Sequence, residues 1–162
     1  MGHEVYELTV KDFVTLDPVS IRVEDTVHDA LVLMGQHQVS SLPVIDNVGE
    51  CVGMLSTVDL VDVTRDAEQD IRDLDLLDLS TKRFLLDKIM QTLGHEKVCE
   101  FMSECLVTAS LETTIGEATK KMLRNHVHHL PVIDHENQLL GIVSSMDLLT
   151  EFADAAPSYE SS

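Results

Sequence analysis

Two serine–aspartate pairs of identical spacing are the residues of this chain best suited to hold a ligand. Ser56 and Asp59 follow one apolar segment, and Ser144 and Asp147 follow another, 88 residues later. A serine hydroxyl at a helix start, beside the N–H groups of the first turn, suits a phosphate. An aspartate one turn later can accept hydrogen bonds from the two hydroxyls of a ribose. The same pairs could instead be helix caps with a favourable first-turn charge and no ligand, so both interpretations stay open.

The pairs lie within a longer internal repeat. Residues 12–61 and 100–149 align without a gap and are identical at 16 of 50 positions, which is too many for chance. One such unit is too small to bury a core by itself. The sequence therefore predicts two copies packed against each other about a pseudo-two-fold axis.

Each copy predicts the order strand, helix, strand, strand, helix, and hence a mixed α/β (α+β) fold. Residues 19–23 and 107–111 are predicted to be half-buried strands. The short strands at 44–46 and 132–134 are each followed by a hairpin turn and a return strand, at 51–55 and 139–143. The return strands are apolar throughout and are predicted to be buried on both faces. Apolar residues at helical spacing mark the buried face of the first helix in each copy: Val27, Ala30, Leu31 and Met34, then Ile115, Ala118, Met122 and Leu123.

These patterns divide the chain into five parts. We predict a lead-in at 1–10, a first repeat at 11–63, a linker at 64–98, a second repeat at 99–152 and a frayed tail at 153–162. The linker begins with an acidic stretch at 66–73, which is expected to be exposed. Its second half, around 81–90, has a helical apolar face and is expected to end near Gly94.

Composition limits the possible partners. The net charge of −18 opposes binding to the phosphate backbone of nucleic acids, and only 4% of residues are aromatic. The three cysteines, Cys51, Cys99 and Cys105, suggest neither a disulfide framework nor a zinc site. No apolar stretch approaches the ~18 residues of a membrane span, and the acidic N-terminus is unlike a secretory signal. We therefore expect a cytoplasmic protein that binds neither nucleic acid nor membrane.

The repeated motif resembles the cystathionine-β-synthase (CBS) domain, pairs of which are called Bateman modules. The resemblance covers residues 11–62 and 99–152. It rests on apolar-x-x-Leu-Pro-Val-Ile-Asp at 39–46 and 127–134, and on Gly-x-x-Ser-x-x-Asp at 53–59 and 141–147. It implies a regulatory module that needs no cofactor, binds AMP, ADP, ATP or S-adenosylmethionine in clefts between the repeats, and forms flat homodimers. No nucleophile elbow, P-loop or H-E-x-x-H motif is present, so we do not expect an enzyme.

The resemblance also implies which residues line the two clefts, each of which draws on both repeats. Valine side chains would hold an adenine between them, in a pocket that is mostly apolar. One cleft would combine Ser144 and Asp147 with Thr15, Val19, Val39 and Ser40, and the other Ser56 and Asp59 with Ser103, Val107, Val127 and His128.

Two adjacent histidines distinguish the second repeat, because His128 and His129 stand where the first repeat has Ser40 and Ser41. They resemble the basic pair that contacts phosphate in the γ subunit of AMP-activated protein kinase. An ordinary exposed role is the main alternative, and a metal site is a weaker one because the spacing completes no tetrahedral set. We predict that the cleft containing Asp147 is the better nucleotide site. The acidic charge favours AMP or S-adenosylmethionine over free ATP.

A second function fits the same sequence. A ligand-free dimerisation or adaptor module could use exposed apolar helix faces to bind a protein partner. The long linker at 64–98 and the lack of an effector domain in this sequence are compatible with that alternative.

Overall fold

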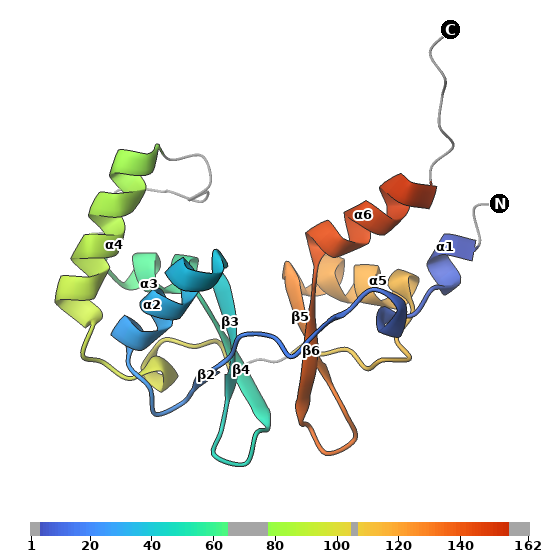
Figure 1. Ribbon diagram of the computed structural model, residues 1–162, viewed down its shortest axis with the longest axis horizontal. Coiled ribbons are helices and arrows are strands. Elements are labelled where there is room, and N and C mark those ends of the chain that lie inside the picture. The colour runs from blue at the N-terminus through green and yellow to red at the C-terminus, as the bar shows by residue number, and fades with distance from the viewer. Residues whose placement is uncertain (1–3, 65–77, 105–106, 156–162) are drawn as a thin grey trace, which may run out of the picture. The chain divides into compact units, whose positions relative to one another are not determined.

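The structure is a computed structural model that describes residues 4–64, 78–104 and 107–155 (Figure 1). The chain divides into two compact units. We call Val19–Leu106 the repeat-1 unit, and Met1–Pro18 together with Val107–Ser162 the repeat-2 unit. The acidic stretch at 66–73 lies outside the described residues.

The repeat-1 unit contains a three-stranded sheet in the order β2-β3-β4. Strands β2 and β3 run parallel, and β3 and β4 form an antiparallel hairpin. The elements are β2 (Ile21–Arg22), α2 (Val27–His37), β3 (Ser41–Ile45), β4 (Cys51–Ser56), α3 (Thr57–Thr64), α4 (Leu79–Leu93) and a 3-10 turn, η3 (Val98–Glu100).

The repeat-2 unit contains a second three-stranded sheet, in the order β1-β6-β5, in which both pairings are antiparallel. Together with the first sheet, this confirms the predicted α+β fold. The elements are α1 (Glu4–Glu7), a 3-10 turn η1 (Val10–Asp12), β1 (Thr15–Leu16), α5 (Ile115–Asn125), β5 (His129–Ile133), β6 (Leu139–Ser144) and α6 (Ser145–Ala155).

A threonine caps the N-terminus of the first helix in each repeat. Thr26 and Thr114 cap α2 and α5 through reciprocal hydrogen bonds with Asp29 and Glu117. The predicted apolar faces are buried, and the exception is Leu123, whose side chain is 70% exposed. One predicted core position of α5 is therefore a surface position.

The prediction that the return strands are buried on both faces is wrong. Burial alternates along β4, and Val143 of β6 is fully buried while Ile142 and Ser144 on either side of it are half-buried. The buried face packs on the helices, since Val143 shares a core cluster with Ile115 and with Leu148 of α6. Among the residues that the structure describes, no helix of its own unit covers the opposite face of either sheet.

The segment at the start of each repeat pairs with the hairpin of the other repeat. Strand β1, near the start of repeat 1 in the sequence, pairs with β6 of repeat 2, and Val10 is buried in the repeat-2 core. Reciprocally, Ser103 pairs with Met54 of β4 through N···O distances of 2.8 and 3.1 Å. The compact units therefore differ from the sequence repeats at 11–63 and 99–152, and those boundaries stay a prediction.

The predicted linker helix is present as α4, which begins after Asp78 and ends at Gly94. Ile89 on its inner face is fully buried in the repeat-1 core, where Met90 and Leu93 also pack. Of the predicted tail at 153–162, the first three residues complete α6. The rest lies outside the described residues.

The pairing of β1 with β6 generates a first prediction. A Cβ at Gly141 would lie 2.6 Å from both the Thr15 carbonyl oxygen and Val14 Cγ2, so Gly141→Ala should push β1 away from β6. We expect the free energy of unfolding to fall by about 1–3 kcal/mol in urea denaturation. Gly35→Ala is the matched control, because a Cβ there meets no atom within 4 Å in helix α2. It should raise stability by about 0.5–1 kcal/mol, and equal effects of the two changes would contradict the packing of β1.

Candidate functional site

Each serine–aspartate pair forms reciprocal hydrogen bonds where a strand passes into a helix. The Ser144 N–H donates to Asp147 Oδ2 at 2.7 Å, and the Asp147 N–H donates to Ser144 Oγ at 3.1 Å. The corresponding distances for Ser56 and Asp59 are 3.0 and 3.2 Å. The pairs are therefore helix caps. Capping uses one oxygen of each aspartate, and the other, Oδ1, accepts no hydrogen bond from the described part of the chain.

The residue before each proline-containing strand fixes the same junction. The Ser145 N–H donates to the His128 carbonyl at 2.8 Å, and the Thr57 N–H donates to the Ser40 carbonyl at 3.0 Å. These bonds occupy N–H groups in the first turns of α6 and α3. Each helix start consequently offers a phosphate fewer N–H groups than the sequence alone suggests.

Strand register places three polar side chains of the repeat-2 unit on one face of the sheet. His129 pairs with Ser144 across β5 and β6, and Thr15 pairs with Ile142 across β1 and β6. Positions 142 and 144 point to the same side because side chains alternate along a strand. Thr15, His129 and Ser144 therefore share the face opposite the helices.

The repeat-1 unit repeats this arrangement with smaller side chains. Ser41 pairs with Ser56, and Ser103 pairs with Met54, so these three serines share the sheet face opposite the core. Sequence reasoning missed Ser41, because its approach to Ser56 follows from strand register and is not visible in the motif. The unit brings together Ser56, Asp59 and Ser103 of the predicted site.

The pKa of the His129 imidazole is lowered by its surroundings. Burial lowers the pKa of its imidazole below the ordinary 6.5, the neighbouring His128 lowers that pKa further, and the Asp147 carboxylate raises it. At neutral pH the ring is uncharged, and it can donate one N–H to a ligand. Its position beside Asp147 joins it to the junction of β6 and α6.

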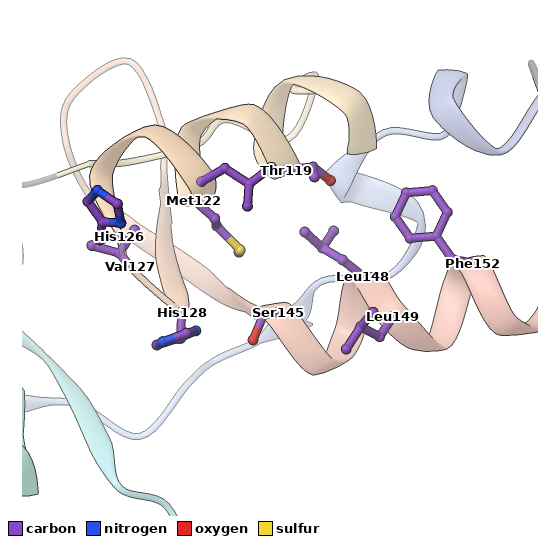
Figure 2. A pocket seen from close by; sticks show the side chains of 10 residues that line it. Thr119, Met122, His126, Val127, His128, Ser145, Leu148, Leu149 and Phe152 are labelled. Atoms are coloured by element: carbon purple, nitrogen blue, oxygen red, sulfur yellow. The ribbon is translucent and has the colours of Figure 1, made fainter. Parts of the chain in front are cut away.

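His128 lies on a different surface. Figure 2 shows its side chain with His126 and Val127 at one end of a pocket of about 350 Å³ between α5 and α6. The opposite end of this pocket is formed by Phe152. The two adjacent histidines therefore do not form one pair on a common surface of the repeat-2 unit.

The other predicted residues are divided between the units. Val39 is 39% exposed in the repeat-1 unit. Val19 packs partly on the repeat-1 core, and Val107 and Val127 pack partly on the repeat-2 core. Each predicted cleft needs residues of both units, and that combination stays a prediction.

In residues 4–64, 78–104 and 107–155, no three His, Cys, Asp or Glu side chains are grouped so that they could hold a metal ion. Within the same ranges, no helix combines the length and apolar character needed to span a bilayer.

The electrostatics of His129 generate a second prediction. The folded-state pKa lies below the unfolded value of 6.5, so the unfolded chain binds more protons in this window. The free energy of unfolding should therefore decrease as the pH falls from 6.5 through the lowered pKa. Urea denaturation should show a smaller decrease for His129→Gln than for the unchanged chain.

Titration of the His129 ring signal by NMR measures the pKa itself. His128→Gln should raise this pKa by removing a like charge, and Asp147→Asn should lower it by removing an opposite one. A His129 pKa at or above 6.5 in the unchanged chain would contradict the assigned burial.

Known proteins resemble this chain over most of its length. An uncharacterized protein of Methanocaldococcus jannaschii is 29% identical over 151 residues, which cover 88% of this chain and 89% of that protein. The gamma-3 subunit of 5′-AMP-activated protein kinase from Sus scrofa is 28% identical over 120 residues, or 74% of this chain but 20% of the subunit. The crystal structure of CBSX2 in complex with AMP is 25% identical, with a TM-score of 0.70, over 92% of this chain and 99% of that one.

The matched family agrees with the fold and with the repeated junctions. The CBS domain family matches residues 10–66 and again 98–154, so each match contains one strand hairpin and one serine–aspartate pair. Because these two matches make up most of the sequence, the chain belongs to the CBS domain family.

Proposed function

We propose that this protein is a regulatory module that binds an adenosine-containing ligand, foremost AMP, at the junction of β6 and α6. The observation that carries the proposal is Asp147 Oδ1, which accepts no hydrogen bond from the described residues and lies beside Ser144 and His129. Two similarities support it: CBSX2 has been crystallised with AMP, and the kinase subunit belongs to an AMP-activated enzyme.

Asp147 would bind the ribose. Its Oδ2 is held at 2.7 Å by the Ser144 N–H, so the carboxylate is already oriented before a ligand arrives. Oδ1 can then accept hydrogen bonds from the 2′- and 3′-hydroxyls. A group fixed in advance loses little conformational freedom on binding, and this favours affinity.

The phosphate would be held mainly by neutral donors. Ser144 Oγ accepts the Asp147 N–H and keeps its own hydrogen to donate, and the Thr15 hydroxyl and the His129 ring lie on the same sheet face. These groups suit a single phosphate better than a triphosphate in a chain of net charge −18. AMP is therefore favoured over ADP and ATP, and S-adenosylmethionine, which has no phosphate, would leave these donors unused.

The two junctions should differ in affinity. Asp59 has the same capping bonds as Asp147, but Ser41 replaces His129 beside it. The shorter serine cannot reach as far toward a phosphate as the imidazole. We propose that the Asp147 site is the tighter one, with the adenine held by valines of the sets predicted for the clefts.

The module would regulate and not catalyse. A ligand shifts the equilibrium between two conformations of a protein only if it binds one of them more tightly. Such a shift is how occupancy would be signalled. The proposal places the protein in the cytoplasm, where it would act on a partner or through its own assembly.

Calorimetric titration with AMP provides the third prediction. Asp147→Asn keeps one oxygen for the helix cap but removes the carboxylate, so AMP affinity should fall about tenfold or more. Asp29→Asn is the matched control, because Asp29 makes the same reciprocal capping bonds with Thr26 at the start of α2. Its effect on affinity should be negligible. The proposal fails if AMP, ADP, ATP and S-adenosylmethionine all give no heat, or if both variants weaken binding equally.

The fourth prediction compares the AMP affinities of the Asp147 and Asp59 junctions. Asp59→Asn should leave the tighter AMP binding step unchanged and weaken or remove only a second, weaker step. The same calorimetric titration resolves both steps. If the tighter step depended on Asp59 and not on Asp147, the proposed order of the sites would be reversed.

A further inference from the structure

A cavity of about 440 Å³ lies at the turn end of the β5–β6 hairpin. The proposed AMP junction is at the opposite end of β6, where α6 begins (Figure 1). The walls of the cavity are formed by residues 108–113, by Lys121 of α5, and by residues 133–135 with Leu140. All of these residues belong to the repeat-2 unit. The volume lies within the roughly 300–1,000 Å³ that is usual for small-molecule sites.

Lys121 brings a positive charge to this cavity. The residue is half-buried, and its Nζ donates one hydrogen bond of 2.7 Å to the carbonyl oxygen of Thr108. An ammonium group has three N–H donors, so two of them remain. In the described part of the chain, no carboxylate oxygen lies within 4.0 Å of Lys121 Nζ. Removing a charge from water is unfavourable unless that charge is paired, so a ligand that supplies a negative group is favoured here.

The internal repeat shows that this lysine stands at an apolar position of the fold. Leu33 lies 88 positions before Lys121 and packs partly on the repeat-1 core. By the same offset, Arg22 of repeat 1 corresponds to Ser110 of repeat 2. Repeat 2 therefore has a cation where repeat 1 has an apolar side chain, and a short hydroxyl side chain where repeat 1 has a long cationic one. The fold itself does not require a lysine at position 121.

A carboxylate of fixed orientation lines the same cavity. Asp134 Oδ1 accepts hydrogen bonds from the N–H groups of Glu136 and Gln138, at 2.8 and 3.0 Å, within the hairpin turn. Asp134 Oδ2 accepts no hydrogen bond from the described residues. Glu112 adds a second carboxylate, which is exposed. A ligand with only negative charge would meet these two groups, and a ligand with only positive charge would meet Lys121.

Hydroxyl groups and apolar side chains form the rest of the cavity. Thr113 is buried, and its Oγ1 accepts the Ser110 N–H at 2.9 Å and lies 3.3 Å from Ser110 Oγ. This part of the wall is therefore ordered before a ligand arrives, and such preorganisation favours affinity. Leu111, Ile133 and Leu140 are half-buried and give the cavity an apolar surface.

We propose that this cavity binds a free α-amino acid with an apolar side chain. Lys121 Nζ donates to the carboxylate of the amino acid, and Asp134 Oδ2 accepts from its ammonium group, so both contacts are charge-assisted hydrogen bonds. The apolar side chain lies on Leu111, Ile133 and Leu140. A zwitterion satisfies both signs of charge in the cavity, whereas a simple anion or cation satisfies one and opposes the other. This site goes beyond the proposed AMP site and does not depend on it.

Calorimetric titration of the full chain with L-leucine, L-isoleucine, L-valine and L-methionine tests the site. At least one of these amino acids should bind, and Lys121→Leu, which restores the residue type of repeat 1, should weaken that binding by about tenfold or more. Lys120→Leu is the matched control, because Lys120 is the preceding residue of α5, is exposed and does not line the cavity. Its amino-acid affinity should be unchanged. The AMP affinity should be the same in both variants and in the unchanged chain.

Two analogues of the bound amino acid test the need for both charges. The amide, which lacks the carboxylate, and the deaminated acid, which lacks the ammonium group, should each bind about tenfold more weakly or worse. If Lys121→Leu unfolds in a circular dichroism melt, Asp134→Asn decides the question, because it should weaken binding while keeping an oxygen for the turn. The proposal is overturned if none of the four amino acids binds the unchanged chain, or if the deaminated acid binds as tightly as the amino acid. Equal affinities of the folded Lys121→Leu and Lys120→Leu variants would overturn it as well.

Discussion

The reciprocal hydrogen bonds between serine and aspartate at the ends of β4 and β6 are the constraint on which the arrangement of both sites depends. They fix the residue at which each strand stops and the helix begins. A cap of this kind contributes about 1 kcal/mol to stability. It also orients a carboxylate whose second oxygen stays available, so one interaction serves the fold and prepares a binding group. Capping and ligand binding, which are alternatives at the level of sequence, are compatible in the structure.

Strand β1 and Ser103, each of which pairs with the hairpin of the other repeat, connect this junction to the rest of the chain. Gly141 and Gly53 have no side chain, and this allows the backbones of Thr15 and Ser103 to lie directly against the hairpins. Thr15 thereby reaches the sheet face of Ser144, although the residues that follow Pro18 belong to the other unit. A ligand that contacts Thr15 would therefore contact a strand of the repeat-2 unit, three residues before Pro18, after which the chain enters the repeat-1 unit.

Local patterns predicted much of the fold, and non-local pairing accounts for what they missed. Apolar residues at helical spacing, among them Ala30 and Ala118, predicted α2 and α5, and Gly94 marked the end of α4. These features depend only on residues that are close in the sequence. The pairing of β1 with β6 was not predicted, since a two-residue strand carries little periodicity and its partner is distant in the sequence. The prediction of Leu123 as a core residue is wrong because helical spacing shows which face of a helix a residue lies on, but not whether another element covers that face.

The sequence predicted the part of the candidate site that lies within one motif, but not the part that depends on strand pairing. Ser144 and Asp147 follow from their motif, whereas the approach of His129 and Thr15 to Ser144 follows from strand register. The division of His128 and His129 between two surfaces follows from strand geometry and helix packing, which adjacency in the sequence does not reveal.

The most direct test of the central claim is an NMR titration of the ¹⁵N-labelled protein with AMP. The account predicts that the backbone amide signals of Thr15, His129, Ser144 and Asp147 shift first and saturate together, while those of the exposed hairpin residue Val48 stay in place. Shifts confined to other parts of the chain, or no shifts at all, would contradict it.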